Sequence, residues 1–159
     1  GVGVLRAGEG YNIVAREAVI EGTVRCFSEE TRAMINGKIA DTARGVAALY
    51  NTTAEIETES FTRALINDAR VYAETAPLVE KVVGRGNLVV KELSLGGDDM
   101  AEIMAVVPGV YAFVGSGSEA VPGSRLAHHT PGFDIDERCL TIAASLYVES
   151  ALFWLKQRT

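Results

Sequence analysis

Histidine and cysteine, the side chains that hold most protein-bound zinc, are scarce in this sequence. The 159 residues include two histidines and two cysteines. Cys26 and Cys139 are far apart and form no CxxC pair, so we expect free thiols in a reducing cytoplasm. His128 and His129 are adjacent, and no HExxH motif is present. These counts exclude a complete metal site of a common type built from this chain alone.

Basic charge and long apolar runs are also lacking. Fifteen lysines and arginines stand against 21 aspartates and glutamates, which gives a net charge of -6 and a pI near 5.0. Nucleic-acid binding requires a basic face, so we expect no nucleic-acid partner. No run reaches the roughly 18 apolar residues that a membrane span needs. The most apolar stretch, residues 139–155, contains polar residues and predicts a buried helix. We therefore expect a cytoplasmic protein without a membrane partner.

The composition that remains is typical of a soluble globular protein. Hydrophobic residues make up 48% and charged residues 23%, and the length suits one domain or parts of two. In the first half, Ser28 and the two acidic residues after it favour a helix start, and apolar residues at helical spacing continue to Tyr50. Residues rich in β-propensity predict strands over residues 2–5, 18–27 and 53–61. These elements suit an antiparallel sheet with helix cover.

The second half alternates helices and strands. Residues 62–68 change character and mark the expected domain boundary. The patterns that follow predict, in order, a helix over 68–83, a strand over 87–92, a short helix that ends before Pro108, a strand over 110–114 buried on both faces, and a last helix over 137–156 capped by Asp136. This order suits part of a parallel or mixed α/β sheet.

The two histidines are candidate functional residues because of their position. They lie in a loop flanked by glycine and proline, after the predicted strand over 110–114. Loops at strand ends carry the sites of α/β folds. Adjacent side chains usually point apart, so we expect at most one of them to ligate a metal. Residue chemistry leaves three roles open: metal ligand, general acid or base, and structural residue.

Four motifs occur in order along the chain. They are AGEGYNIVAREAVIEGTVRCFSEETR at residues 7–32, LIND at 65–68, GDDM at 97–100, and HHTPGFDIDE at 128–137 after the apolar run 110–115. Together they resemble the aminoacylase, hippurate hydrolase and indoleacetyl-amino-acid hydrolase group of co-catalytic metallopeptidases. In that group they correspond to a lid segment, the return into the catalytic domain, a helix start and the closing metal-binding motif. The last motif is the most specific.

The resemblance implies an α+β fold in two parts. Residues 1–64 would form a partial lid and dimerisation domain, a ferredoxin-like antiparallel sheet with helix cover that lacks its first strand and helix. Residues 65–159 would form the C-terminal portion of an α/β metallopeptidase catalytic domain. The implied partners are a small N-acyl amino acid or peptide substrate and a second copy of the chain. The implied cofactor is a divalent metal, zinc, manganese or similar, in the intact enzyme.

The resemblance also implies roles for four residues. His129, directly before Thr-Pro, matches the last metal ligand of the family. Asn12 and Arg25, thirteen residues apart, match two lid residues that bind the substrate carboxylate, for which a guanidinium fork is well suited. Gly115 matches a position where the backbone approaches the substrate.

Most of the family's site has no counterpart in this chain. Its other metal ligands and its general-base glutamate belong to a part that the sequence does not contain. We therefore expect part of a metal-dependent amidohydrolase that cleaves the amide bond of N-acyl amino acids or small peptides, inactive and holding metal poorly as this chain alone. The chain would be a truncated product, a proteolytic fragment or a separate domain, or a second chain would supply the rest. The alternatives are a non-catalytic dimerisation or carboxylate-binding module and an unrelated α/β binding domain.

Overall fold

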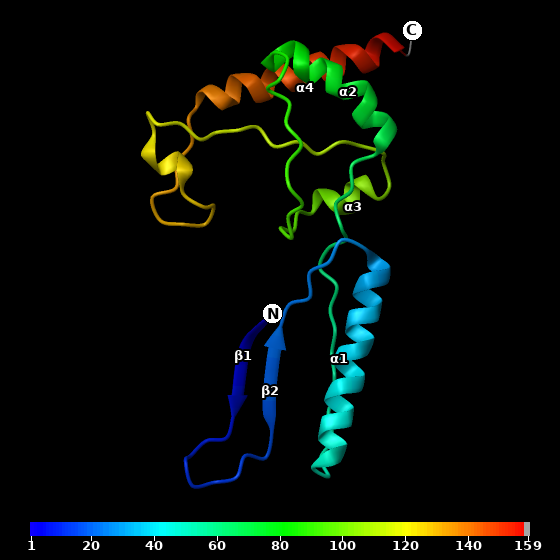
Figure 1. Cartoon of the computed structure of the whole chain (residues 1–159), viewed down its shortest axis with the longest axis vertical. Coiled ribbons are helices and arrows are strands. Elements are labelled where there is room, and N and C mark those ends of the chain that lie inside the picture. The colour runs from blue at the N-terminus through cyan, green and yellow to red at the C-terminus, as the bar shows by residue number, and fades with distance from the viewer. Residues whose placement is uncertain (158–159) are drawn as a thin grey trace. The chain divides into compact units, whose positions relative to one another are not determined.

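A computed structural model describes residues 1–157 (Figure 1). The chain divides into two units. The first comprises Gly1–Leu65 and Ser94–Glu102, and the second comprises Ile66–Leu93 and the residues from Ile103 onward. The first division falls one residue from the boundary expected between residues 64 and 65. The segment Ser94–Glu102 groups with the first unit, although the sequence pattern had placed it in the second.

The first unit begins with a two-stranded antiparallel hairpin. Strand β1 (Val2–Ala7) pairs with β2 (Ala18–Gly22), with an irregularity between Val2 and Val4. The strand predicted over residues 18–27 therefore ends at Gly22, where its pairing partner is already Val2. Every residue of β2 is exposed, so neither face of this hairpin is buried.

Helix α1 (Glu29–Leu49) forms as predicted. The Ser28 side chain accepts a hydrogen bond from the N–H of Thr31 at 3.1 Å, and Glu29 and Glu30 place negative charge in the first turn. Arg32 on α1 donates to the carbonyl of Thr62 at 3.3 Å, which ties the segment after the helix back to its first turns. Within residues 1–157, α1 makes no close backbone contact with another helix or strand. The expected helix cover of the sheet stays a prediction, because a two-stranded hairpin alone offers only a narrow face to a helix.

The second unit is built on two helices, α2 (Ala69–Val83) and α4 (Arg138–Gln157), which pack against each other. The Asp68 carboxylate caps α2 by accepting from the N–H of Val71 at 2.9 Å, as the sequence predicts. Pro77 lies inside α2 without ending it. Lys81 of α2 and Glu149 of α4 form an ion pair at 2.6 Å. The short helices α3 (Met100–Met104) and η1 (Pro122–Arg125) complete the described elements.

Three predicted strands are absent from residues 1–157: those over 53–61, 87–92 and 110–114. A strand requires a neighbouring strand to which its backbone hydrogen-bonds. In the segment over 110–114, a side chain takes the place of that neighbouring strand. The Asn67 side chain donates to the carbonyl of Tyr111 at 3.1 Å and accepts from its N–H at 2.8 Å. The N–H of Asp68 donates to the carbonyl of Gly109 at 3.0 Å. The apolar run has the composition of a strand but no ladder in the described chain.

Helix α4 is apolar and yet exposed. Its helical state is confirmed, but the prediction that it is buried is wrong for this chain, because none of its residues is buried. The helix has 20 residues, and an 18-residue window within it has a mean hydropathy of 1.3, so by length and composition alone it could cross a membrane. The core helix of a soluble protein passes the same test. Among described residues, the buried ones are Val71, Ala101, Ser124 and Asp136. Two of these four are polar, and both lie near the histidine pair.

Candidate functional site

His129 lies on a closed loop that runs from Ser116 to Asp136. At its base, the N–H of Asp136 donates to the carbonyl of Ser116 at 3.0 Å. Nearer the tip, the N–H of Asp134 donates across the loop to the carbonyl of Gly123 at 3.2 Å. These two bonds join the outgoing and returning legs of the loop, which we call the His129 loop. The histidine pair lies in the stretch between them.

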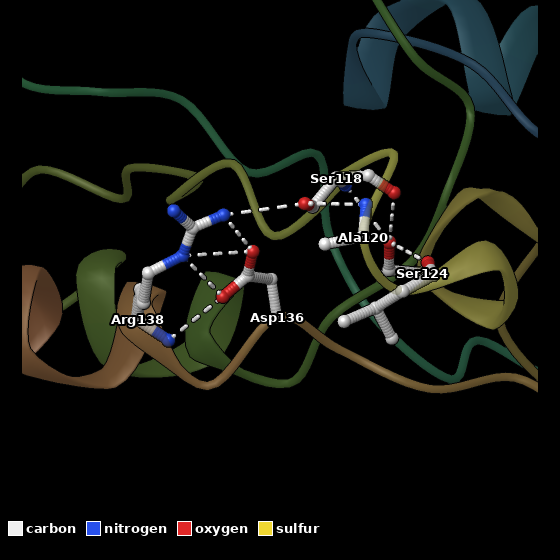
Figure 2. A network of polar contacts seen from close by, with 6 residues as sticks. Ser118, Ala120, Ser124, Asp136 and Arg138 are labelled. Atoms are coloured by element: carbon white, nitrogen blue, oxygen red, sulfur yellow. Dashed lines mark hydrogen bonds and ion pairs between the residues drawn. The ribbon is translucent and has the colours of Figure 1, made fainter.

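Two buried polar side chains, Ser124 and Asp136, lie inside the His129 loop (Figure 2). The Ser124 hydroxyl accepts from the N–H of Ser118 at 2.8 Å and donates to the carbonyl of Val121 at 2.5 Å. The Asp136 carboxylate accepts from the backbone N–H of Arg138 at 3.1 Å and from its guanidinium Nε at 2.9 and 3.0 Å. Arg138 Nη2 donates to the Ser118 hydroxyl at 3.2 Å. The network connects the start of α4 to the outgoing leg of the loop.

Asp136 is held in its charged form. Hydrogen bonds from the Arg138 side chain, and next from the Arg138 backbone N–H, hold the pKa of the Asp136 carboxyl well below its ordinary value. The same contact raises the pKa of Arg138. The predicted capping of α4 by Asp136 is confirmed, since the carboxylate accepts from the second residue beyond it. The capping pattern did not predict its second role, which is to accept hydrogen bonds from the Arg138 guanidinium.

His129 itself adopts an unusual backbone conformation. Its φ is +65°, in the left-handed region, which it shares among described non-glycine residues with Asn51. This region costs an L-residue roughly 1–2 kcal/mol, although histidine tolerates it better than most. The neighbouring His128 packs edge-on against Phe133, with ring centroids 4.8 Å apart. The His129 imidazole is exposed, and within residues 1–157 no hydrogen bond to another side chain or backbone group occupies it.

The His129 loop offers one metal ligand rather than a complete site. A neutral imidazole suits zinc and related divalent metals. Within residues 1–157, no three histidine, cysteine, aspartate or glutamate side chains are grouped so that they could hold an ion. A catalytic zinc site takes about three protein ligands. His129 therefore fits a metal only in combination with ligands supplied from elsewhere.

Asn12 and Arg25 both belong to the first unit, but the structure does not bring them together. Asn12 lies in the turn between β1 and β2, and Arg25 follows the opposite end of β2 (Figure 1). The length of β2 alone separates them by about 13 Å at the usual rise per residue. Arg25 Nη1 donates to the carbonyl of Leu95 at 2.8 Å. As folded here, the two side chains do not share one carboxylate, because a straight strand runs between them.

Gly115 lies in the second unit, just before the His129 loop. It is exposed, and a Cβ built on it would meet no atom within 4 Å. The backbone is therefore open to an approaching molecule at this point.

Three residues of the network around Asp136 were missed by sequence reasoning: Ser118, Ser124 and Arg138. The separation of Ser118 from Arg138, twenty residues, gives no local signal of contact. The one available signal was the pair Asp136 and Arg138 at the predicted helix start. An acidic cap followed by a basic residue two positions later permits the contact without requiring it.

The fold and the loop together match a known class of hydrolase. No protein-family model matches the chain. A crystal structure of the YxeP protein of Bacillus subtilis, a dinuclear metal-binding peptidase of the M20 family, is similar to this chain with a TM-score of 0.81 and 28% sequence identity, covering 98% of this chain and 42% of that one. The homologues of this chain are amidohydrolases and deacetylases of the M20 family, and the chain covers the C-terminal part of the catalytic domain.

Two curated relatives match this chain over most of its length. An uncharacterised hydrolase of Sinorhizobium fredii is 30% identical over 148 residues, which is 93% of this chain and 36% of the relative. An N-acetylcysteine deacetylase of Bacillus subtilis is 30% identical over 152 residues, which is 96% of this chain and 38% of the relative. The resemblance inferred from the four motifs is confirmed. The chain spans a little over a third of the length of these relatives.

Proposed function

We propose that this chain is part of a metal-dependent amidohydrolase that hydrolyses the amide bond of N-acyl amino acids or small peptides, with His129 as one metal ligand. The observation that carries the proposal is the His129 loop. It carries an exposed His129 whose backbone is left-handed, and it contains two buried polar residues, Ser124 and Asp136. The relatives support the reaction, since one is an N-acetylcysteine deacetylase and the structural neighbour binds two metals. We further propose a cytoplasmic location, from the composition.

The chain's own contribution to the reaction is binding and orientation. A divalent metal, zinc, manganese or similar, would polarise the amide carbonyl and activate water when bound. His129 would hold one side of that metal, and the exposed backbone at Gly115 would face the substrate. Because the chain offers one ligand, we expect it to be inactive when isolated.

Replacement of His129 tests the ligand assignment. In the full-length protein, we expect His129→Ala to lower bound zinc or manganese, measured by elemental analysis, together with hydrolysis of N-acetyl amino acids. The matched control is His128→Phe, which keeps an aromatic ring against Phe133 and removes the adjacent imidazole. Metal content and activity that survive His129→Ala would refute the assignment. Equal losses in both variants would also refute it.

Arg25 is the stronger of the two proposed carboxylate-binding residues. Its guanidinium is exposed and uses Nη1 for the carbonyl of Leu95, which leaves further donors for a substrate carboxylate. Asn12 is proposed separately, because it lies beyond the far end of β2. We expect Arg25→Ala to lower kcat/KM more than tenfold for substrates with a free carboxylate, consistent with loss of a charge-assisted bond of about 1.5–3 kcal/mol. An equal loss for the corresponding amide substrates would contradict this role.

A second candidate function is a non-catalytic module. The lack of a three-ligand cluster in residues 1–157 favours it. In this form residues 1–64 would pair two copies as a lid and dimerisation domain, or bind a carboxylate ligand. Analytical ultracentrifugation of the chain separates the two functions. A stable metal-free dimer that binds N-acyl amino acids without hydrolysing them would favour the module.

A further inference from the structure

The His129 loop contains an ion pair between the buried Asp136 carboxylate and the exposed Arg138 side chain, and the proposed reaction gives this pair no part. Asp136 is 9% exposed, and its carboxylate accepts from three donors of Arg138, the backbone N–H, Nε and Nη2. Burial of a charge is costly unless the charge is paired and hydrogen-bonded. A cap for α4 requires one bond to a backbone N–H and does not require the guanidinium of Arg138. The guanidinium bonds both Asp136 and Ser118, so it links the helix start to the outgoing leg of the loop.

Hydrogen bonds connect this ion pair to both legs of the His129 loop, which carry the tip. The backbone of Asp136 closes the base through its bond to Ser116, while Arg138 reaches the outgoing leg at Ser118. Ser118 is in turn bonded to Ser124, beside which Gly123 accepts from the returning leg at Asp134. The two legs are thus joined on both sides of the ion pair.

The tip depends on the two legs to keep its conformation. His129 has a φ of +65°, and Gly132, three residues later, has a φ of +84°. Left-handed conformations at non-glycine residues persist where the surrounding structure fixes them. The tip has few contacts of its own: the packing of His128 on Phe133 and the bond from the Phe133 N–H to the carbonyl of Thr130 at 3.0 Å. The constraint must therefore come from the legs.

We propose that the Asp136–Arg138 pair, bonded to Ser118, is a positioning device that fixes the His129 loop and so orients the His129 imidazole toward a metal ion. This inference rests on the proposed function of His129. Removal of the Asp136 charge would release the outgoing leg and let His129 relax toward an ordinary backbone conformation. The ligand would then be present but poorly oriented.

The test compares Asp136→Asn with Asp134→Asn in the full-length protein. Asp134 is exposed, lies on the same leg, and its carboxylate accepts from the N–H of the next residue, Ile135. We expect Asp136→Asn to weaken zinc binding about tenfold in competition with a chelator, the low end of the range for groups that orient a metal ligand, because Asp136 acts through the loop and does not bond His129. We also expect kcat to fall with KM unchanged. Asp134→Asn should alter neither quantity by more than about twofold.

Limited trypsin digestion gives a readout that is independent of metal. Arg125 is exposed at the end of η1, inside the loop, and cleavage after it reports opening of the loop. We expect faster cleavage there in Asp136→Asn, with unchanged rates elsewhere. Where that variant unfolds globally, Ser118→Ala, which removes the hydroxyl that Arg138 reaches, should show the same changes more weakly.

Two failures are distinguishable. Equal zinc affinity and equal cleavage in Asp136→Asn and Asp134→Asn would overturn the positioning role. Unchanged zinc affinity in His129→Ala would overturn the ligand assignment. Faster cleavage after Arg125 in Asp136→Asn would in that case still show that the Asp136–Arg138 pair holds the His129 loop closed.

Discussion

Two glycines of the second unit differ in the space around them. A Cβ on Gly123 would lie 2.5 Å from the carbonyl oxygen of Gly132 and 3.0 Å from the Cβ of Asp134. A Cβ on Gly115 would meet nothing within 4 Å. We expect Gly123→Ala to push the legs of the His129 loop apart and lower the free energy of unfolding by about 1–3 kcal/mol, as overpacking does. We expect Gly115→Ala to change it by less than about 0.5 kcal/mol.

The variants Gly115→Ala and Gly123→Ala separate an effect on substrate binding from an effect on folding. Because Gly115 is proposed to face substrate, its methyl group should raise KM for an N-acyl amino acid while the protein remains stable. Urea unfolding and steady-state kinetics of the full-length variants measure both effects. Gly115→Ala with normal KM would argue against the substrate contact, and Gly123→Ala with normal stability would argue against the tight crossing of the legs.

At the scale of single residues, the sequence predicts what is local and misses what depends on the path of the chain. His129 is proposed as a ligand because its neighbours form a contiguous motif. Ser118 was missed because its contact with Arg138 depends on closure of a long loop. A shared carboxylate site for Asn12 and Arg25 stays a prediction, because sequence spacing alone does not say that β2 lies between the two residues.

At the scale of elements, α1 contains two glycines that its packing does not require. A Cβ on Gly37 or Gly45 would meet no atom within 4 Å. Glycine in a helix interior costs about 0.8–1.0 kcal/mol relative to alanine. We expect each change to alanine to raise helicity, measured by circular dichroism at 222 nm, and to stabilise the protein by about that amount. The control is Gly84→Ala, which we expect to destabilise the end of α2, since Gly84 has a φ of +88°.

A loss of stability in Gly37→Ala or Gly45→Ala would contradict an open environment for these positions. It would show that another surface, such as the second copy in the proposed dimer, packs against α1 in solution.

Helices were predicted well and strands poorly, for a physical reason. A helix satisfies its backbone within one segment, so capping residues such as Ser28 and Asp68 and apolar spacing are enough to define it. A strand is satisfied by its neighbours, and a β-rich composition cannot supply them. The segment over 110–114 has the composition of a buried strand, and its Tyr111 bonds to the side chain of Asn67 instead.

At the scale of the whole molecule, apolar surface is left open. In α4, Tyr147 is 81% exposed, and Val148 and Leu155 are exposed as well. Within residues 1–157, no large side chain is fully buried. Exposed apolar surface, where it is contiguous, marks an interaction site or leads to aggregation. The helices of the two units therefore enclose no hydrophobic core within residues 1–157. The relatives, which are more than twice as long, have further chain that could cover these helices.

The isolated chain is therefore expected to associate through its apolar faces. We expect residues 1–159 alone to bind the dye ANS and to elute in gel filtration above the size of a 17.0 kDa monomer. Because Tyr147 and Leu155 lie on the exposed part of α4, the double variant Tyr147→Glu with Leu155→Glu should lower both dye binding and apparent size. The matched control is the double variant Thr141→Glu with Gln157→Glu, which adds the same two charges at exposed positions of the same helix without removing large apolar side chains. The same acidic variant in the full-length protein should lower its melting temperature, because there the proposed remainder of the catalytic domain covers α4.

The contradicting outcome is an isolated chain that is monomeric, does not bind ANS and unfolds cooperatively. It would show that the apolar faces pack against each other within the chain, and that no larger protein is needed to cover them.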